Sequence, residues 1–103
     1  MENMGFKNPK NCNSLEDVRT EIDKIDEHII SLFSVRHQFV EEIVRFKHDK
    51  DAIIAQKRKE EVILLRKKWA AEKGLNAETF EEIYTLLINS NIKHELELLR
   101  QKK

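Results

Sequence analysis

Apolar residues recur every three or four positions along the first half of the chain, from about Ser14 to about His48. This spacing returns side chains to one face of an α-helix and predicts one long helix. One step, from Leu32 to Phe39, spans two turns, and Arg36 stands at its midpoint. The pattern therefore places a guanidinium group where a core residue is expected. The apolar positions are Leu15, Val18, Ile22, Ile25, Ile29, Leu32, Phe39, Ile43 and Phe46.

The predicted helix is too long for a domain of this size. Ser14 can cap its first N–H groups, with Asp17 as the acidic member of a capping box, and no Gly or Pro interrupts the run until past Lys50. At 1.5 Å per residue, roughly 34 residues give a rod of about 50 Å. A compact domain of about 100 residues is only about 35 Å across. We therefore expect a second copy of the chain to cover the overhang.

Two further helices are predicted after a polar loop at residues 48–51. The second runs from about Ala52 or Ala55 to Glu72, and Gly74 follows as a stop signal. The third runs from about 77 to 101, with Asn76 as its N-cap. Residues 1–13 have no periodicity and are interpreted as an N-terminal tail, which leaves residues 14–103 as one helical domain. The expected fold class is all-α, with a three-helix subunit.

Each later helix also carries a charged residue inside its apolar stripe. Arg58 lies between Ile54 and Val62 on the second helix, and Glu95 lies between apolar positions of the third. Lys47 follows Arg36 by eleven residues, which on a helix returns it to nearly the same face about 16 Å away. Packing the three stripes together would bring these four groups into one interior pocket.

Composition narrows what such a pocket can bind. Charged residues make up 37% of the 103 residues and cancel to a formal net charge of zero, which argues against binding nucleic acid or anionic membranes through bulk charge. A buried cation needs a partner, so a local group of cations indicates a small ligand with carboxylates. One cysteine excludes a disulfide within the chain, and no segment has the apolar length of a membrane span or a signal peptide. The expected location is the cytoplasm.

Each cation taken alone is better explained as a surface side chain at the edge of an apolar face. Four cations at stripe positions together favour a site: Arg19, Arg36, Lys47 and Arg58. Arg19 is about 25 Å from Arg36 along the same helix, so it can reach this pocket only from a second subunit. The histidines do not recur at the i, i+4 spacing of metal ligands, and we expect them to be solvated or partly packed, with no metal site. They are His28, His37, His48 and His94.

The segment LEDVRTEIDKIDEHIISLFSVRHQFVEEIVRFK, followed by Arg58 and by a polar residue late in the third helix, resembles the all-helical chorismate mutases. The resemblance covers about residues 12–100. The stretch NPKNCNSLEDVRTEIDKID is especially similar to the isochorismate-pyruvate lyase branch of that family. What it implies is an intertwined homodimer with two identical pockets and no cofactor. Arg19 would come from the partner subunit, Arg36 and Arg58 would hold carboxylates, and Lys47 would bond the ether oxygen and a carboxylate.

The resemblance has departures that bear on the substrate. Glu95 stands where many members carry Gln as a second donor to the ether oxygen, and Asn91 is taken as a further substrate-binding residue. Lys59 and Ala55 stand where mutases often carry acids, one of which holds the ring hydroxyl of chorismate. These two places lean toward the lyase branch, whereas Glu95 leans away from it.

The expected activity is a chorismate mutase, which makes prephenate in aromatic amino acid biosynthesis, a branch of the shikimate pathway. The close alternative is an isochorismate-pyruvate lyase, which makes salicylate and pyruvate. Both reactions require a folded substrate and an ether oxygen whose negative charge is stabilised as its bond breaks. A third hypothesis, from another class, is a non-catalytic helical dimerisation module in which the charged groups are surface pairs.

Overall fold

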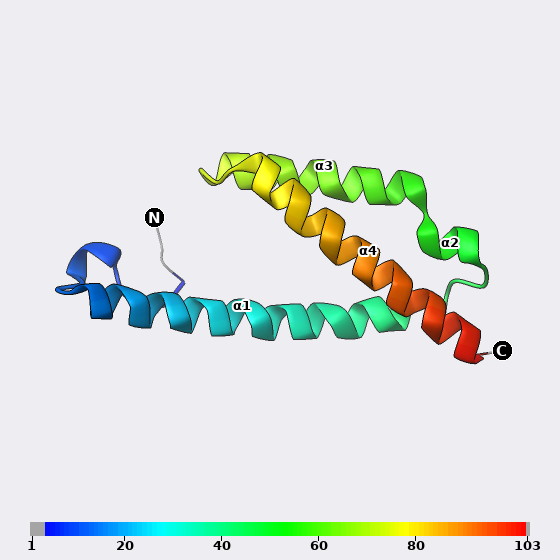
Figure 1. Cartoon of the computed structure of the whole chain (residues 1–103), viewed down its shortest axis with the longest axis horizontal. Coiled ribbons are helices and arrows are strands. Elements are labelled where there is room, and N and C mark those ends of the chain that lie inside the picture. The colour runs from blue at the N-terminus through cyan, green and yellow to red at the C-terminus, as the bar shows by residue number, and fades with distance from the viewer. Residues whose placement is uncertain (1–3, 103) are drawn as a thin grey trace. The chain divides into compact units, whose positions relative to one another are not determined.

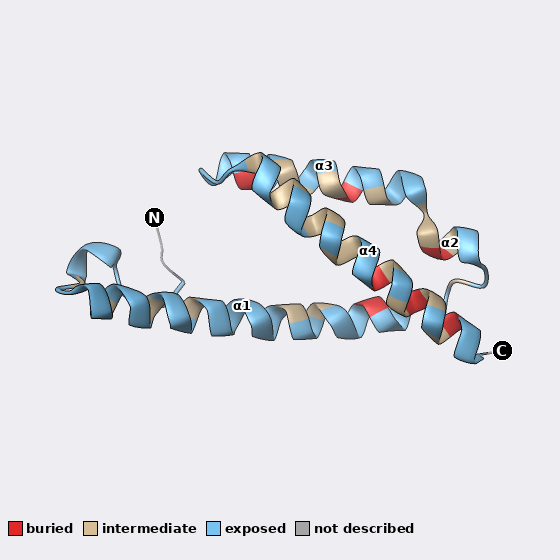
Figure 2. Ribbon diagram, viewed as in Figure 1, coloured by how far each residue is buried: buried red, intermediate tan, exposed pale blue. Residues whose placement is uncertain are grey.

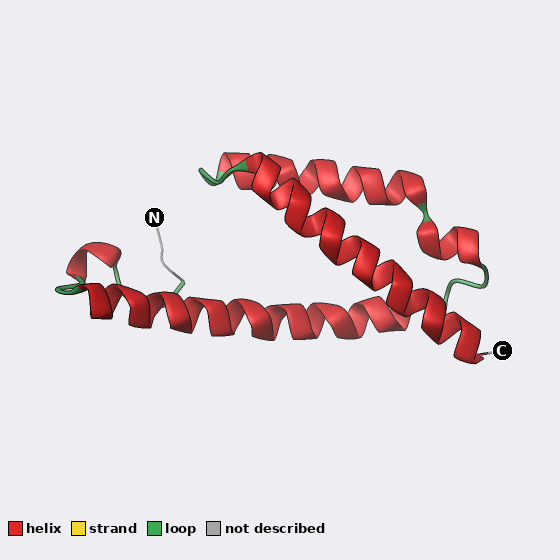
Figure 3. Cartoon of the chain, viewed as in Figure 1, coloured by secondary structure: helices red, strands yellow, loops and turns green. Residues whose placement is uncertain are grey.

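A computed structural model describes residues 4–102 as helices joined by short connections, with no strand among them (Figure 1, Figure 3). The expected all-α fold class with one long first helix is confirmed. No helix of the described part is long and apolar enough to cross a membrane. The elements are η1 (Pro9–Asn11), α1 (Leu15–Ile43), α2 (Lys50–Ile54), α3 (Gln56–Glu72) and α4 (Ala77–Lys102).

The chain divides into two compact units, residues 1–36 and 37–103. In the first, the start of α1 has the expected cap, because the Ser14 hydroxyl accepts the Asp17 N–H at 3.0 Å. The Asp17 carboxylate reaches back one residue further than a capping box requires and accepts the N–H of Asn13 at 3.0 Å. That hydrogen bond lowers the pKa of Asp17, and the charge of Lys7 and the Ser14 hydroxyl act in the same direction. The helix therefore begins at a site that favours a negative charge.

In the second unit, α3 and α2 both pack against α4. A small core forms where Val44, Ile53 and Leu99 meet, with partly buried leucine and isoleucine side chains of α4 around it. Buried positions are confined to a few places along these helices (Figure 2). The core stays small because many of the other large apolar side chains are exposed in the single chain.

The first helix ends five residues before the predicted end. After Ile43 the chain tightens into bonds between residues three apart, from the N–H groups of Val44, Arg45 and Phe46 to the carbonyls of residues 41, 42 and 43. The tight turn directs Val44 into the core beside Ile53. Apolar spacing alone could not reveal this end, because Phe46 continues the helical pattern. Lys47 therefore lies after α1, and the prediction that it shares one helix face with Arg36 is wrong.

The predicted second helix is two helices. Asp49, with extended backbone, accepts the Ala52 N–H at 2.8 Å and caps α2, so the expected loop at residues 48–51 already holds the first turn of a helix. Ala55 then adopts a left-handed conformation, with φ 38° and ψ 60°, and separates α2 from α3. A non-glycine residue pays a steric cost there, and nothing in the sequence signals the break. The later signals hold: Gly74 has φ 78°, and Asn76 caps α4 through the Thr79 N–H.

Most of the apolar stripe predicted for α1 is exposed in the single chain. Leu32 is 56% exposed and Phe39 69%, whereas the buried apolar residues at the end of the helix are Val40 and Val44. The end of α1 thus has two apolar faces. This chain covers the face with Val40 and leaves the face with Phe39 exposed. The other exposed stripe residues are Leu15, Val18, Ile22, Ile29, Ile43 and Phe46.

Candidate functional site

The most buried face of α4 carries two polar side chains. Asn91, Glu95 and Leu99 follow one another at intervals of four residues and are 8%, 5% and 7% exposed. Residues at this spacing lie one above another on a helix, so the amide and the carboxyl group share the face that meets the rest of the unit. Burying a polar group costs free energy unless it is hydrogen-bonded, so a fold that buries two of them on one face often uses them to bind something. This face of α4 is therefore a candidate ligand site.

Lys47 lies opposite Glu95. Its Nζ is 3.9 Å from Glu95 Oε1, and the two side chains are 26% and 7% exposed. The early end of α1 produces this approach, because the turn at residues 44–46 carries Lys47 to α4. A partly buried ammonium group beside a buried carboxyl group has a stronger field than the same pair in water. The pair can hold a polar ligand and stabilise negative charge on one of its oxygens.

The remaining predicted site residues are less buried. Arg58 lies in the first turn of α3, just after the break at Ala55, and its side chain is exposed in the single chain. Arg19 and Arg36 belong to the first unit, where Arg19 is exposed and Arg36 half-buried. Among the predicted site residues, Lys47 is the cation that the second unit places beside the polar face of α4.

A separate aromatic hollow lies at the other end of the α3–α4 pair. Its volume is about 160 Å³, and its lining includes Trp69, Phe80 and Tyr84. The guanidinium of Arg66 lies over the rings of Trp69 and Tyr84, at 4.7 and 5.7 Å from their centroids. Eleven residues of α4 separate Tyr84 from Glu95, or about 16 Å. This hollow is therefore not part of the Lys47–Glu95 site.

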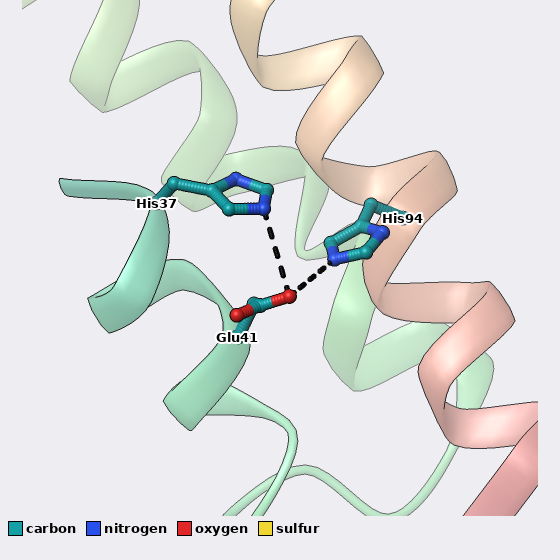
Figure 4. Close-up of side chains that lie close together, drawn as sticks. All are labelled: His37, Glu41 and His94. Atoms are coloured by element: carbon teal, nitrogen blue, oxygen red, sulfur yellow. Dashed lines mark hydrogen bonds and ion pairs between the residues drawn. The ribbon is translucent and has the colours of Figure 1, made fainter. Parts of the chain in front are cut away.

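Sequence reasoning missed a second polar cluster, at the crossing of α1 and α4. His94 lies 53 residues from Glu41, and its ring Nε2 donates to Glu41 Oε2 at 2.8 Å. His37 Nε2 lies 3.6 Å from the same oxygen, and the two imidazole rings are stacked with centroids 4.9 Å apart (Figure 4). The hydrogen bond from His94 lowers the pKa of Glu41, helped by the charges of both histidines. The only sequence signal was the i, i+4 spacing of His37 and Glu41.

Residues 18–96 match the family model described as chorismate mutase type II. The chain is 33% identical over 98 residues to the isochorismate pyruvate lyase of Pseudomonas aeruginosa, covering 95% of this chain and 97% of that protein. It is 29% identical over 83 residues to the T-protein of Haemophilus influenzae, covering 80% of this chain but 22% of that longer protein. The family match spans most of the helical region that holds Lys47 and Glu95. On these findings, the chain belongs to the chorismate mutase type II family.

Proposed function

We propose that this chain is a chorismate mutase, which rearranges chorismate to prephenate in a cationic pocket. The observation that carries the proposal is the buried Glu95 beside Lys47, in a chain of the chorismate mutase type II family. The rearrangement is unimolecular: the ether carbon–oxygen bond breaks while a carbon–carbon bond forms. It needs a folded substrate and stabilisation of the charge that develops on the ether oxygen. A positioned cation beside a buried acid provides that stabilisation.

In this mechanism Lys47 donates a charge-assisted hydrogen bond to the ether oxygen. Protonated Glu95 donates a second one, because an ionised carboxylate has only acceptor atoms and would repel the same charge. Arg36 and Arg58 hold the two carboxylates of the substrate, and Asn91, on the same face of α4 as Glu95, contacts its polar periphery. No covalent intermediate is required. The domain that performs this chemistry comprises residues 14–103, and residues 1–13 are its N-terminal tail.

The proposal includes a homodimer that shares its pockets. The apolar face of α1 supports it, since Val18, Ile22 and Leu32 are 40%, 49% and 56% exposed in the single chain. A second copy of α1 along this face would bury these side chains at a gain of roughly 25 cal/mol for each Å² removed from water. Arg19 lies beside Val18 and would enter the partner's pocket.

A second candidate function is isochorismate-pyruvate lyase activity on the same scaffold. One observation favours it: the similarity to the Pseudomonas aeruginosa lyase extends over nearly the full length of both chains. The resemblance to the family adds that Ala55 and Lys59 stand where mutases often carry acids around Arg58. Loss of those acids weakens the recognition of the chorismate ring hydroxyl. The lyase breaks the same ether bond and releases pyruvate.

The test is to offer chorismate and isochorismate separately and to identify the products by NMR. The protein should be produced in a host without its own chorismate mutase, with Lys47→Ala as a control carried through the same purification. The proposal predicts prephenate from chorismate, with a much slower reaction in the control. Salicylate and pyruvate from isochorismate, without prephenate from chorismate, would assign the second function instead. If neither substrate reacts, both assignments are wrong.

A binding experiment separates an enzyme from a non-catalytic dimerisation module. A dianionic mimic of the bicyclic transition state should raise the melting temperature, because a ligand that binds only the folded state stabilises it by RT ln(1 + [L]/Kd). The same concentration of a simple dianion such as succinate controls for ionic strength. Equal shifts with both compounds would favour the module.

A further inference from the structure

The cluster at the crossing of α1 and α4 brings three metal-binding side chains together in the second unit. The candidate ligand atoms of His37, Glu41 and His94 all lie within 4.8 Å of one another. Both imidazoles present Nε2 to a single oxygen of Glu41, at 3.6 and 2.8 Å (Figure 4). Their side chains are 48%, 44% and 37% exposed, in the order 37, 41, 94, so an ion can reach them from solvent. The reaction proposed above uses none of the three.

We propose that His37, Glu41 and His94 form a binding site for a divalent transition metal ion of the Zn²⁺ class. Two imidazole nitrogens and one carboxylate oxygen are a ligand set that zinc accepts, with a fourth position open to water. Nitrogen-rich sites of this kind also bind Co²⁺, Ni²⁺ and Cu²⁺, whereas Mg²⁺ and Ca²⁺ prefer oxygen ligands alone. The site is therefore selective for the class of ion and not for zinc within it.

The geometry requires only side-chain movement. Zinc–nitrogen distances of about 2.0–2.1 Å place neighbouring ligand atoms of a tetrahedral site about 3.3 Å apart. The two distances to Glu41 Oε2, 2.8 and 3.6 Å, lie on either side of that value. The widest separation, 4.8 Å, exceeds it by about 1.5 Å, which rotation of exposed imidazoles can close. An ion would replace the proton that His94 now shares with Glu41.

A bound ion would fasten the end of α1 to α4. His37 and Glu41 are one turn apart on α1, and His94 comes from α4, next in sequence to Glu95. Such a link holds two helices that otherwise meet through few buried side chains, and it fixes the backbone beside the Lys47–Glu95 pair. The inference is independent of the proposed activity, because it concerns the binding of an ion and the stability of the fold.

The test uses the full chain without an affinity tag, in a Cys12→Ser background so that the thiol does not compete. Zn²⁺ is titrated by calorimetry near pH 7.5 into this protein and into versions carrying His37→Gln, Glu41→Gln or His94→Gln. We expect one ion per chain, and binding at least about tenfold weaker in each variant, in line with the losses seen when metal-site partners are altered. His48→Gln, a histidine outside the cluster, should bind as the background does.

NMR of the four histidine rings in the background protein gives a second test, which does not depend on whether the variants fold. Zn²⁺ should shift the ring signals of His37 and His94 at low ratios and leave those of His28 and His48 in place. The melting temperature of the background protein should rise with Zn²⁺ and not with Mg²⁺. The proposal is wrong if no ion binds, if His48→Gln weakens binding as much as the cluster variants do, or if all four rings shift alike.

Discussion

Glu95 and Lys47 come from different parts of the chain, and their approach depends on a local feature of each. Glu95 is buried because α4 repeats its inward positions every four residues, from Asn91 through Glu95 to Leu99. Lys47 reaches it because α1 stops at Ile43 and the turn that follows carries the lysine toward α4. An ammonium group held 3.9 Å from a buried carboxyl group is poorly screened by solvent. That environment suits the roles proposed for both residues.

Replacing Lys47 by alanine should lower kcat for chorismate more than it raises KM. In the proposed mechanism the lysine acts on charge that grows only in the transition state, so its loss would remove stabilisation that the bound substrate does not use. By analogy with the loss of one oxyanion donor, kcat should fall by a factor of about 100 or more, or about 3 kcal/mol. Lys50→Ala, at the exposed start of α2, is the matched control and should be near normal. Near-normal turnover in Lys47→Ala would remove the lysine from the mechanism.

Replacing Glu95 by glutamine should raise kcat near neutral pH. The amide donates a hydrogen bond whatever the pH, whereas the carboxyl group donates only when it is protonated. Steady-state kinetics at pH 7.5 would measure the change, with Glu97→Gln, an exposed residue paired with Arg100, as the control. If turnover is lost in Glu95→Gln but not in the control, the negative charge is needed to balance Lys47 and the donor role is wrong.

The sequence identified the members of this pair but not the way they meet. Charged residues inside apolar stripes marked Glu95, Lys47, Arg36 and Arg58, because a stripe position implies burial. The structure buries Glu95 and half-buries Lys47, while Arg58 stays exposed in the single chain. The histidine cluster was missed for a physical reason. Its members meet only through the crossing of α1 and α4, and periodicity along one helix carries no information on such contacts.

Helix ends were predictable where a side chain or a glycine makes them. Ser14 and Asn76 accept backbone N–H groups, and Gly74 takes a positive φ. The end of α1 and the break at Ala55 were not predictable, because they depend on packing of Val44 and Ile53 around Leu99 and on a left-handed alanine. Local residues therefore determine three ends of the long helices, whereas the end of α1 and the break at Ala55 depend on the packing and backbone conformation of the folded chain.

The start of α1 should become less stable in acid. The N–H of Asn13, bonded to the carboxylate, holds the pKa of Asp17 below its ordinary value. A lowered pKa in the folded state means that the charged form stabilises the fold above the unfolded pKa, and that this contribution is lost as pH falls through the folded value. NMR titration of the carboxyl carbon should show the lowered pKa. Below about pH 4, stability should fall more steeply in the wild type than in Asp17→Asn; parallel curves would contradict the assignment.

Ala55→Gly should stabilise the chain. A left-handed conformation costs an alanine roughly 1–2 kcal/mol, and glycine avoids that cost while losing about 0.4–1 kcal/mol through greater freedom in the unfolded state. The net expectation is a gain of roughly 0.8 kcal/mol, measured by urea unfolding. Ala70→Gly, in the interior of α3, should instead destabilise by at least about 1 kcal/mol. A loss of stability in Ala55→Gly would show that its methyl group contributes more through packing than the conformation costs.

At the scale of the whole molecule, the exposed face of α1 is the main unfinished feature of the single chain. Its apolar residues follow the helical period over the whole length of α1, yet among residues 4–102 the buried apolar side chains all lie in the second unit. Soluble monomers rarely expose apolar surface over such a length. The spacing of apolar residues predicted this pattern, and the length of the helix predicts a second copy of the chain, which stays a prediction.

The most direct test of the account is to mix two inactive variants, Arg19→Ala and Arg36→Ala, and to measure prephenate formation from chorismate. If each pocket takes Arg36 from one subunit and Arg19 from the other, a mixed dimer contains one intact pocket and one doubly altered pocket. Random exchange makes half of the dimers mixed, so activity should return to about a quarter of the wild-type value per chain. Exchange of subunits, shown by native mass spectrometry, without any return of activity would contradict the shared pocket.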